Sequence, residues 1–396
     1  MRPSVRDAML AAAACACSLV VAELGLRSLS SVSPVVRTLL AHPRDVPQPL
    51  EDPSWIVRPN PAVRGSDDAG YRNPRVPQHA DVVTLGDSQT YGASVPIGRK
   101  WPRRLESLTG QSTYNLAHGG FGPAHSRLQL DAALALRPSV VFVAVYSAND
   151  LFDTYTMVHQ RGHFPELLPQ DAEELRRLHA LDVSSPFPRA ARTVYPRGGW
   201  LSEHSRVYGL GRAIKTLVRE ARRRTWSEMK RRVQPNGYEL LFDRGGLRTV
   251  LTPRWRGIGL RRDDGRIREG ERLVLALLTE IDSLVRAAGA RCIVVFIPTK
   301  ELVLTSLPGT EDLLANPALA QMVRDEAQLW TNLESHLARS GVQVMDTRPA
   351  LVRLAAEGTL PYQPTDDGHL SIEGQMEVAR LAARALRRNP RAQPVS

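Results

Sequence analysis

The sequence predicts an α/β protein built on a doubly wound parallel sheet. Two observations predict this class. Short apolar runs recur along the chain, which is typical of strands buried on both faces. Amphipathic helical patterns separate these runs, and strands that alternate with helices indicate βαβ units. With 396 residues, 42% of them hydrophobic, the chain is long enough for one large domain with insertions or for two domains.

The N-terminal residues 1–25 combine a basic start with an apolar stretch. Arg2 and Arg6 precede residues 8–22, which are apolar except for Ser18. Fifteen helical residues span roughly 22 Å, short of the ~30 Å hydrocarbon core of a bilayer. We expect a signal peptide or a membrane anchor, and a buried core helix is the alternative. Either of the first two places the rest of the chain in the cell envelope, facing the periplasm or the exterior, or secretes it.

Residues 26–80 are irregular and rich in proline, and they predict a stalk that leads into the main domain. That domain is expected over residues 81–390. Its predicted strands and helices alternate along the chain. The apolar runs that predict the strands cover 81–85, 113–117 (the weakest), 140–146, 292–297 and 342–346; the helical patterns cover 101–108, 124–136, 270–289, 318–341 and 371–388.

Residues 151–265 interrupt this alternation. They are charged and rich in arginine and proline, with helical pieces such as 203–224, and they predict a helical insertion or cap. The basic run at 219–232 fits a solvated helix face, or else an anionic membrane surface or polysaccharide. No nucleic-acid-binding motif accompanies it, so nucleic acid is not an expected partner despite the net charge of +11.

Polar clusters follow several predicted strands, where an open α/β sheet gathers its active residues. Ser88 comes after the first strand, Gly120 after the second and Asn149 after the third. A serine needs a base to become a nucleophile, and His369 is the candidate. Asp366 or Asp367 could orient its imidazole.

Attack on an ester also needs donors for the oxyanion that forms. The backbone N–H groups of Ser88 and Gly120 and the side-chain amide of Asn149 could supply three. Asp87 is expected to brace the turn rather than to act in catalysis. The three cysteines predict neither a disulfide framework nor a metal site. Lys300, after the fourth strand, is read as an ordinary surface lysine in preference to a residue that faces the site.

Four segments, in this order along the chain, resemble the blocks of the SGNH/GDSL hydrolase family: "GDSQTYG", "NLAHGGFGP", "SAND" and "DDGHLSIEG". The resemblance covers about residues 70–385. It implies a flavodoxin-like three-layer α/β/α fold with about five parallel strands, and no cofactor or metal. It also implies Ser88 as nucleophile, His369 as general base, and Gly120 and Asn149 as parts of the oxyanion hole.

The chain departs from the family pattern in two places. Ser147 stands where the asparagine block usually has glycine. The histidine block usually places its acid three residues before the histidine, which selects Asp366, but a variant with a spacing of two selects Asp367. Both acids stay open.

Further segments, among them "GYRNP" and "IPTKE", resemble a membrane-associated bacterial subgroup of this family. The resemblance implies a serine esterase that forms an acyl-serine and acts on O-acyl groups of a cell-envelope carbohydrate or on another ester. The alternatives are an O-acyltransferase for an extracellular polysaccharide and a non-catalytic scaffold of a polysaccharide assembly. The intact set of Ser88, Asn149 and His369 argues against the scaffold. A membrane surface is a possible further partner.

Overall fold

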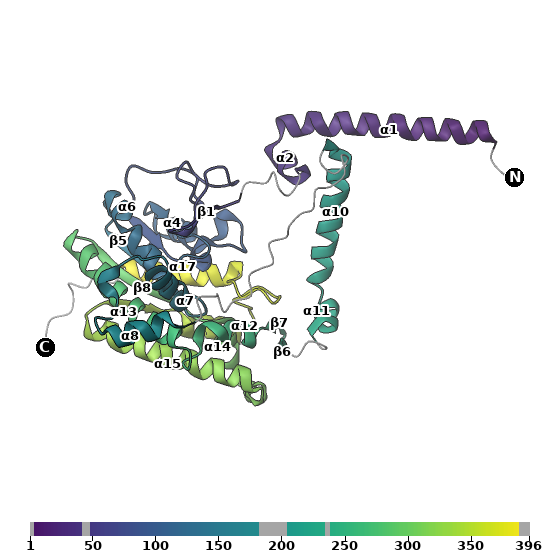
Figure 1. The fold of residues 1–396 in the computed structure, drawn as a ribbon. Coiled ribbons are helices and arrows are strands. Elements are labelled where there is room, and N and C mark those ends of the chain that lie inside the picture. Colours follow the sequence, from purple (N-terminus) through teal and green to yellow (C-terminus); the bar gives the residue numbers. More distant parts are fainter. Residues whose placement is uncertain (1–3, 42–47, 182–203, 234–237, 388–396) are drawn as a thin grey trace. The chain divides into compact units, whose positions relative to one another are not determined.

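The computed structural model describes residues 4–41, 48–181, 204–233 and 238–387, and the chain divides into two compact units (Figure 1). One unit consists of residues 1–48 and 189–228, and the other of residues 49–188 and 229–396. Part of the expected insertion, residues 189–228, therefore groups with the N-terminal segment and not with the domain that interrupts it.

The larger unit contains a five-stranded sheet in the order β4-β3-β5-β8-β9. All neighbouring strands are parallel. The first strand lies inside the sheet, with the second on one side and the third on the other, which is the flavodoxin-like order. The predicted fold class is confirmed. The strands are β3 (Val82–Leu85), β4 (Thr113–Asn115), β5 (Val140–Tyr146), β8 (Arg291–Ile297) and β9 (Gln343–Asp346).

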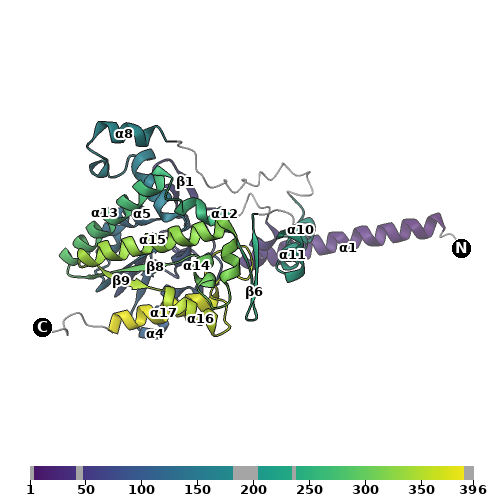
Figure 2. The same cartoon turned by 90° about the horizontal axis from the view of Figure 1, so that it is seen from below.

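Helices cover both faces of this sheet (Figure 2). One face carries α13 (Gly265–Ala287) and α15 (Pro317–Arg339), and the other carries α4 (Trp101–Thr109), α16 (Arg348–Ala356) and α17 (Ile372–Arg387). Successive side chains of a strand point to opposite faces. The central strands β5 and β8 are therefore apolar almost throughout, because each face needs its own core.

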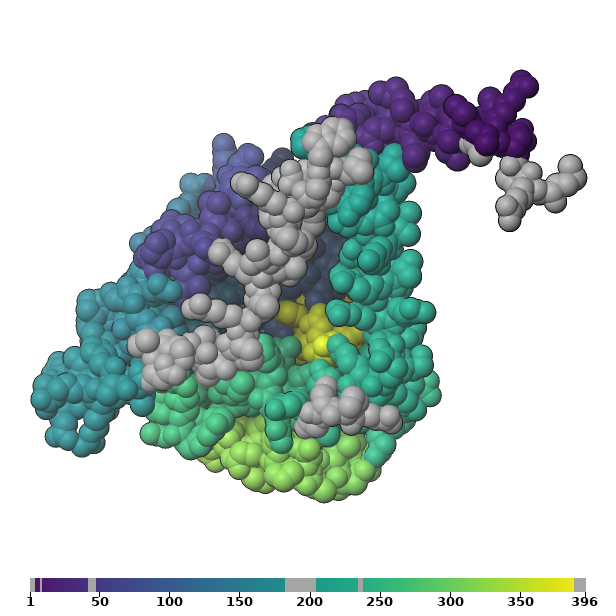
Figure 3. All heavy atoms as spheres, turned by 45° about the vertical axis from the view of Figure 1, so that its right-hand side comes forward, coloured from purple at the N-terminus to yellow at the C-terminus, as the bar shows by residue number. Residues whose placement is uncertain are grey.

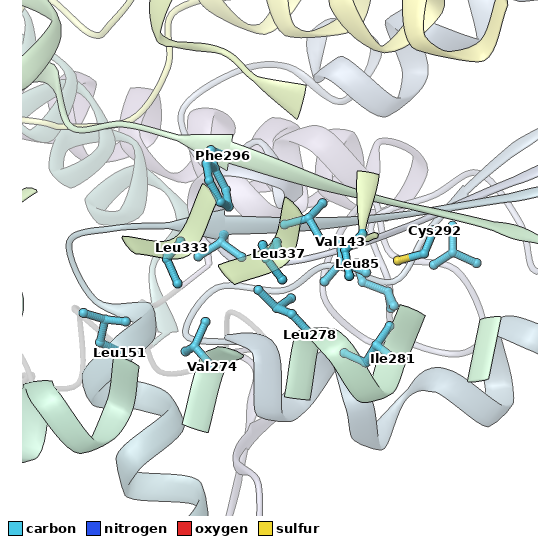
Figure 4. Packing of buried hydrophobic residues seen from close by; sticks show 14 of the residues in the cluster. Leu85, Val143, Leu151, Val274, Leu278, Ile281, Cys292, Phe296, Leu333 and Leu337 are labelled. Atoms are coloured by element: carbon cyan, nitrogen blue, oxygen red, sulfur yellow. The ribbon is translucent and has the colours of Figure 1, made fainter. Parts of the chain in front are cut away.

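Strand β5 illustrates this alternation. Val143 lies in the core with Leu278 of α13 and Leu337 of α15, whereas Phe142 lies in the opposite core with Trp101 of α4. Figure 4 shows the first of these cores, with side chains of the strands and of both helices in contact. Burial of each large apolar side chain contributes about 1.5–3 kcal/mol to the stability of the fold. The two cores therefore stabilise the sheet, and with it the edge that carries the polar clusters.

The helix predicted over residues 124–136 is in fact two helices, α5 (Pro123–Leu128) and α6 (Leu130–Ala135). Gln129 lies at the junction, and its side-chain amide donates to the carbonyl of Leu116 at 2.9 Å. The remaining elements of this unit are short: α3 (Ser88–Tyr91), η2 (Ile97–Arg99), α7 (Asp150–Tyr155), η3 (Thr156–Gln160), η4 (Pro165–Leu167), α8 (Ala172–His179), α12 (Pro253–Arg256), η5 (Gly257–Leu260), α14 (Lys300–Thr305) and η6 (Glu311–Ala315).

The expected helical insertion also contains an antiparallel hairpin, which the sequence interpretation missed. Strands β6 (Leu240–Arg244) and β7 (Leu247–Leu251) pair directly. Gly245 and Gly246 connect them, both with positive φ. Two such residues between apolar stretches are a strong hairpin signal, because a two-residue turn of this twist favours glycine at both positions.

Residues 49–80 belong to the larger unit and are not a free stalk. They begin with a small hairpin, β1 (Leu50–Asp52) and β2 (Ile56–Arg58). Further along, Asp67 is buried and accepts a hydrogen bond from Tyr114 of β4 at 2.8 Å. Asn73 donates to the carbonyl of Asn115 at 3.0 Å. This part of the proline-rich segment is therefore fastened along the edge strand.

The smaller unit contains α1 (Val5–Val32), α2 (Pro34–Leu40) and α10 (Arg206–Arg223), and α11 (Trp226–Val233) crosses the boundary along the chain. Helix α1 continues beyond the apolar stretch and spans roughly 42 Å. It is long and apolar enough to cross a membrane. Glu23 of α1 accepts hydrogen bonds from the backbone N–H groups of Arg206 and Val207, both at 3.0 Å, at the start of α10.

Candidate active site

Ser88 lies at the carboxyl end of β3, where the chain order of the sheet reverses. Ligands of open α/β sheets bind at this position. Gly86 makes the approach possible, because it adopts a φ of +144° and a Cβ there would lie 2.9 Å from the Cβ of Ala144 on β5. The carboxylate of Asp87 accepts a hydrogen bond from the backbone of Gln89 at 3.0 Å and caps α3. The turn therefore presents Ser88 at the first position of a short helix.

The loop before α17 brings His369 to this serine. Nε2 of His369 lies 2.8 Å from Oγ of Ser88. Nδ1 of the same ring lies 2.6 Å from Oδ1 of Asp367. Burial would raise the pKa of Asp367, but hydrogen bonds from His369 and from Ser94 outweigh it and hold the pKa well below its usual range. The acid is therefore ionised and can stabilise a protonated imidazole.

Asp366, the other acid that the sequence left open, does not bond to His369 in the described structure. Its carboxylate lies 3.1 Å from a guanidinium nitrogen of Arg232, and its side chain is 42% exposed. The backbone turns between the two residues, so the neighbouring carboxylates point to different partners. Of the two acids that the sequence left open, Asp367 is the one that bonds to His369, and Asp366 pairs with Arg232 instead.

Gln89 joins the serine turn to the histidine loop, a function that the sequence did not suggest. Its buried side chain donates to the carbonyl of Gly368 at 3.1 Å and accepts from the backbone N–H of Leu370 at 3.0 Å. These two bonds flank His369. They fix the separation between two segments that lie 281 positions apart in the chain.

Lys300 is fully buried, which corrects the expectation of a surface lysine. Its ammonium donates to the carbonyl of Thr365 at 2.6 Å, to the carbonyl of Asp367 at 3.1 Å and to Oγ1 of Thr249 on β7 at 3.1 Å. Burial lowers the pKa of Lys300 to about 8, although nearby Glu301 raises it. The lysine therefore positions the backbone of the loop that carries Asp367, and it also links this loop to strand β7 of the hairpin.

The glycine block, which includes the expected donor Gly120, passes close to the serine turn. A Cβ built on Gly119 would lie 4.0 Å from the Cβ of Ser88, so the glycine block runs alongside the serine turn. Within the part of the chain that the structure describes, the N–H groups of Ser88 and Gly120 donate no hydrogen bond. Both remain available to an acceptor on a substrate.

Asn149 follows β5, the neighbour of β3. Its side-chain nitrogen lies 2.6 Å from a carboxylate oxygen of Asp153 and 3.3 Å from one of Asp150. Ser147, which replaces the usual glycine, is buried and donates to Glu326 at 2.6 Å. The serine thus takes a structural hydrogen bond, and the amide of Asn149 is oriented by an acid one helical turn away.

Two buried carboxyl groups, those of Asp87 and Asp150, and the partly buried one of Asp153 interact near the site. Burial raises the pKa of Asp87 to about 6, against hydrogen bonds from Gln89 and the charge of His369. Burial likewise raises the pKa of Asp153 to about 7 and that of Asp150 well above its usual value. Like charges disfavour ionisation of one another, and Asp87 acts on both of the other acids in this way.

No group of three or more histidine, cysteine, aspartate or glutamate side chains suited to a metal ion occurs among residues 4–41, 48–181, 204–233 and 238–387. The polar groups at the sheet edge are instead bonded to one another and to the backbone.

In the space-filling view of Figure 3, atoms of the C-terminal part of the chain, drawn in yellow, reach the surface.

No protein-family model and no curated protein matches this chain. Solved structures similar to it include the following two. A member of the lipolytic G-D-S-L family from Veillonella parvula DSM 2008 is 11% identical, with 78% of this chain and 98% of that chain covered and a TM-score of 0.36. A catalytic mutant of an acetylxylan esterase from Geobacillus stearothermophilus is 12% identical, with 79% and 97% covered and a TM-score of 0.37. At these identities the function rests on the geometry of the site.

Proposed function

We propose that this chain is a serine esterase of the SGNH hydrolase family. One observation carries the proposal: His369 lies within hydrogen-bond distance of both Ser88, at 2.8 Å, and Asp367, at 2.6 Å. Nucleophile, base and orienting acid are the three parts that acyl transfer by a serine requires. Ser88 comes from the end of strand β3, and His369 and Asp367 come from the loop before α17.

In the first step, Oγ of Ser88 attacks the carbonyl carbon of the ester. The new C–O bond forms as the serine proton moves to Nε2 of His369, and the carbonyl electrons move onto the oxygen. Asp367 stabilises the imidazolium through Nδ1–H. The N–H groups of Ser88 and Gly120 donate to the oxyanion, and the amide of Asn149 joins them by giving up its longer hydrogen bond, the one to Asp150. Collapse breaks the bond to the alcohol, which leaves with the proton from His369.

In the second step, a water molecule attacks the acyl-serine. His369 takes a proton from the water, and the new bond forms at the same carbonyl carbon. Collapse returns the electrons of the C–O bond to Oγ of Ser88, which recovers its proton from His369. The carboxylic acid leaves and the triad is restored. Aligned groups of this kind each contribute factors of about 10²–10⁴ in rate.

The substrate that we favour is an O-acyl group on a cell-envelope carbohydrate, and the sequence resemblance supports it.

The location that we favour is the membrane. Helix α1 presents Leu19, Val20 and Val21 to the exterior, each more than half exposed. A helix of this length exceeds the ~30 Å hydrocarbon core. The chain should stay in the membrane fraction after washing with alkaline carbonate, and its release would contradict the anchor.

Helix α10 supports contact with the membrane surface. Ile214, Leu217 and Val218 are exposed along one side, and Lys215 and Arg219 each lie one position further along the helix, on an adjacent side. A helix with an apolar face and a basic face binds at the interface of anionic lipids. Since Glu23 caps this helix, its start is held at the end of the apolar stretch of α1.

The experiment that tests the esterase proposal is hydrolysis of p-nitrophenyl acetate by the full chain in detergent. The variants Ser88→Ala and His369→Ala should each lose at least ~10³-fold in kcat, because the members of a triad act as a unit. Acetate should be released in equal amount to p-nitrophenol. Activity that survives in Ser88→Ala would contradict the proposal.

A further inference from the structure

A pocket of about 460 Å³ lies beside the histidine loop, on the segment that interrupts the alternation of strands and helices. Pockets of this size accommodate small-molecule ligands. Six residues that give it its chemistry come from the two positions before β6, from α12 and from the loop itself: Tyr238, Glu239, Arg254, Trp255, Arg256 and Asp366.

The pocket adjoins the catalytic loop directly. Asp366 precedes the acid of the triad by one residue. The guanidinium of Arg256 lies against the backbone of Gly368, so closely that a Cβ on that glycine would lie 2.6 Å from its Nη2. Gly368 in turn precedes His369. A ligand in the pocket therefore lies next to the residues that hold the base.

Arg256 is the strongest sign that the pocket takes a ligand. It carries five N–H donors in a rigid fork. Its Nε is buried, and the guanidinium makes no hydrogen bond or ion pair with any other residue that the structure describes. Tyr146, at the carboxyl end of β5, is also buried, and its hydroxyl has no described partner. Buried polar groups are normally hydrogen-bonded, so a set of unused donors at the active edge of a sheet calls for acceptor oxygens from a ligand.

The other side chains define the class of that ligand. Trp255 is 38% exposed and Tyr238 is 61% exposed, with the guanidinium of Arg254 over the tyrosine ring at 4.9 Å. Exposed aromatic rings are apolar platforms with a polar tip. Glu239 and Asp366 add carboxylates, which accept hydrogen bonds.

The charges in the pocket exclude a simple anion or cation site. Two arginines and two carboxylates line it, and Arg232 lies between the carboxylates, 3.1 Å from Asp366 and 3.9 Å from Glu239. A neutral ligand with many hydroxyl groups fits this mixture best. Its hydroxyls can accept from arginine and donate to carboxylate, while its C–H face packs on an aromatic ring.

From these observations we infer that the pocket formed by the residues flanking the β6–β7 hairpin, by α12 and by Asp366 binds a neutral sugar ring of the substrate. This inference rests on the proposed esterase function and names the part of the substrate that lies beyond the ester. The sugar ring contacts Trp255 and Arg256, and the acyl group reaches Ser88. The insertion then determines specificity, and the triad supplies the chemistry.

The test compares two kinds of ester on the full chain in detergent. The kcat/KM for partially acetylated xylo-oligosaccharides and manno-oligosaccharides is divided by the kcat/KM for p-nitrophenyl acetate. We expect the wild type to prefer at least one of the sugar esters. Trp255→Ala should lower this ratio at least tenfold, and Trp255→Phe should retain most of it. Arg256→Gln should lower the ratio as well, and Arg244→Ala, an exposed control on the same hairpin, should not change it.

A binding measurement separates substrate contact from folding. The Ser88→Ala chain should bind the deacetylated form of the preferred oligosaccharide in calorimetry, and adding Trp255→Ala should weaken that binding at least tenfold. A wild type that prefers neither sugar ester, or a ratio that Trp255→Ala leaves unchanged, would overturn the inference. Those outcomes leave the esterase proposal standing, which fails only if Ser88→Ala retains activity on p-nitrophenyl acetate.

Discussion

Replacing Lys300 by methionine tests whether hydrogen bonds from this buried lysine position the loop that carries Asp367 and His369. The substitution keeps the length of the side chain and removes three donated hydrogen bonds, at 2.6, 3.1 and 3.1 Å. The carbonyls of Thr365 and Asp367 would then lose a charged partner. Because neither Ser88 nor His369 is altered, a change in activity reports on geometry.

The magnitude follows from two opposing effects. A hydrogen bond from a charged group contributes about 1.5–3 kcal/mol, so three of them contribute roughly 4–9 kcal/mol. Burial lowers the pKa of Lys300 from 10.5 to about 8, which corresponds to a cost of ~3 kcal/mol for the charged form. Since methionine also fills the volume, we expect a net loss of about 1–3 kcal/mol in the free energy of unfolding. A displacement of the acid by about 1 Å should lower kcat/KM by ~10²-fold.

The assays are denaturant unfolding and hydrolysis of p-nitrophenyl acetate, with the exposed Arg339→Met as control. The pH dependence of the free energy of unfolding shows whether an observed loss of stability comes from the ammonium of Lys300. Because its native pKa is below its unfolded value, the unfolded chain binds more protons between pH 8 and 10.5, and the wild type should gain stability as pH rises through this interval. Lys300→Met should lack that gain. Activity within twofold of wild type, with an unchanged stability profile, would refute the reasoning.

Three further predictions concern the same site. Gln89→Ala should lower kcat/KM for p-nitrophenyl acetate by about 10–100-fold, since both hydrogen bonds to the loop around His369 are lost; kinetics unchanged from wild type would argue against this role. Asp367→Asn should lower kcat by about 10²–10⁴-fold, and Asp366→Asn by less than tenfold, because only the former bonds to the imidazole; equal losses would contradict the assignment of the acid. The pKa of Asp153 is raised to about 7, so between pH 4 and 7 the native chain keeps a proton on Asp153 that the unfolded chain has lost. The free energy of unfolding should therefore fall by up to ~4 kcal/mol as pH rises from 4 to 7. Asp153→Asn should reduce this fall in denaturant unfolding. An equal fall in the variant would refute it.

The sheet could be predicted because its strands are buried on both faces. In β5 every residue is buried, so the apolar run in the sequence and the strand have the same bounds, 140–146. The weakest prediction, 113–117, was also a strand, but a shorter one that ends at Asn115. An edge strand has one neighbour and a polar end, so its pattern is less distinct.

The missed features depend on contacts between segments that are distant in sequence. Lys300 looks like a surface lysine because nothing in its neighbourhood shows that carbonyls of the histidine loop surround it. Asp366 and Asp367 are adjacent, and only the path of the backbone decides which carboxylate meets His369. The β6–β7 hairpin is different, because Gly245 and Gly246 could have predicted it from local turn chemistry.

The most direct test of the account is to label the full chain in detergent with a fluorophosphonate and to locate the label by mass spectrometry. The reagent forms a stable bond to a serine oxygen only where a neighbouring base activates it. We predict a single adduct, on Ser88, and no adduct on Ser88 in the His369→Ala chain. A label on another residue, or one of equal extent in the His369→Ala chain, would contradict the triad of Ser88, His369 and Asp367.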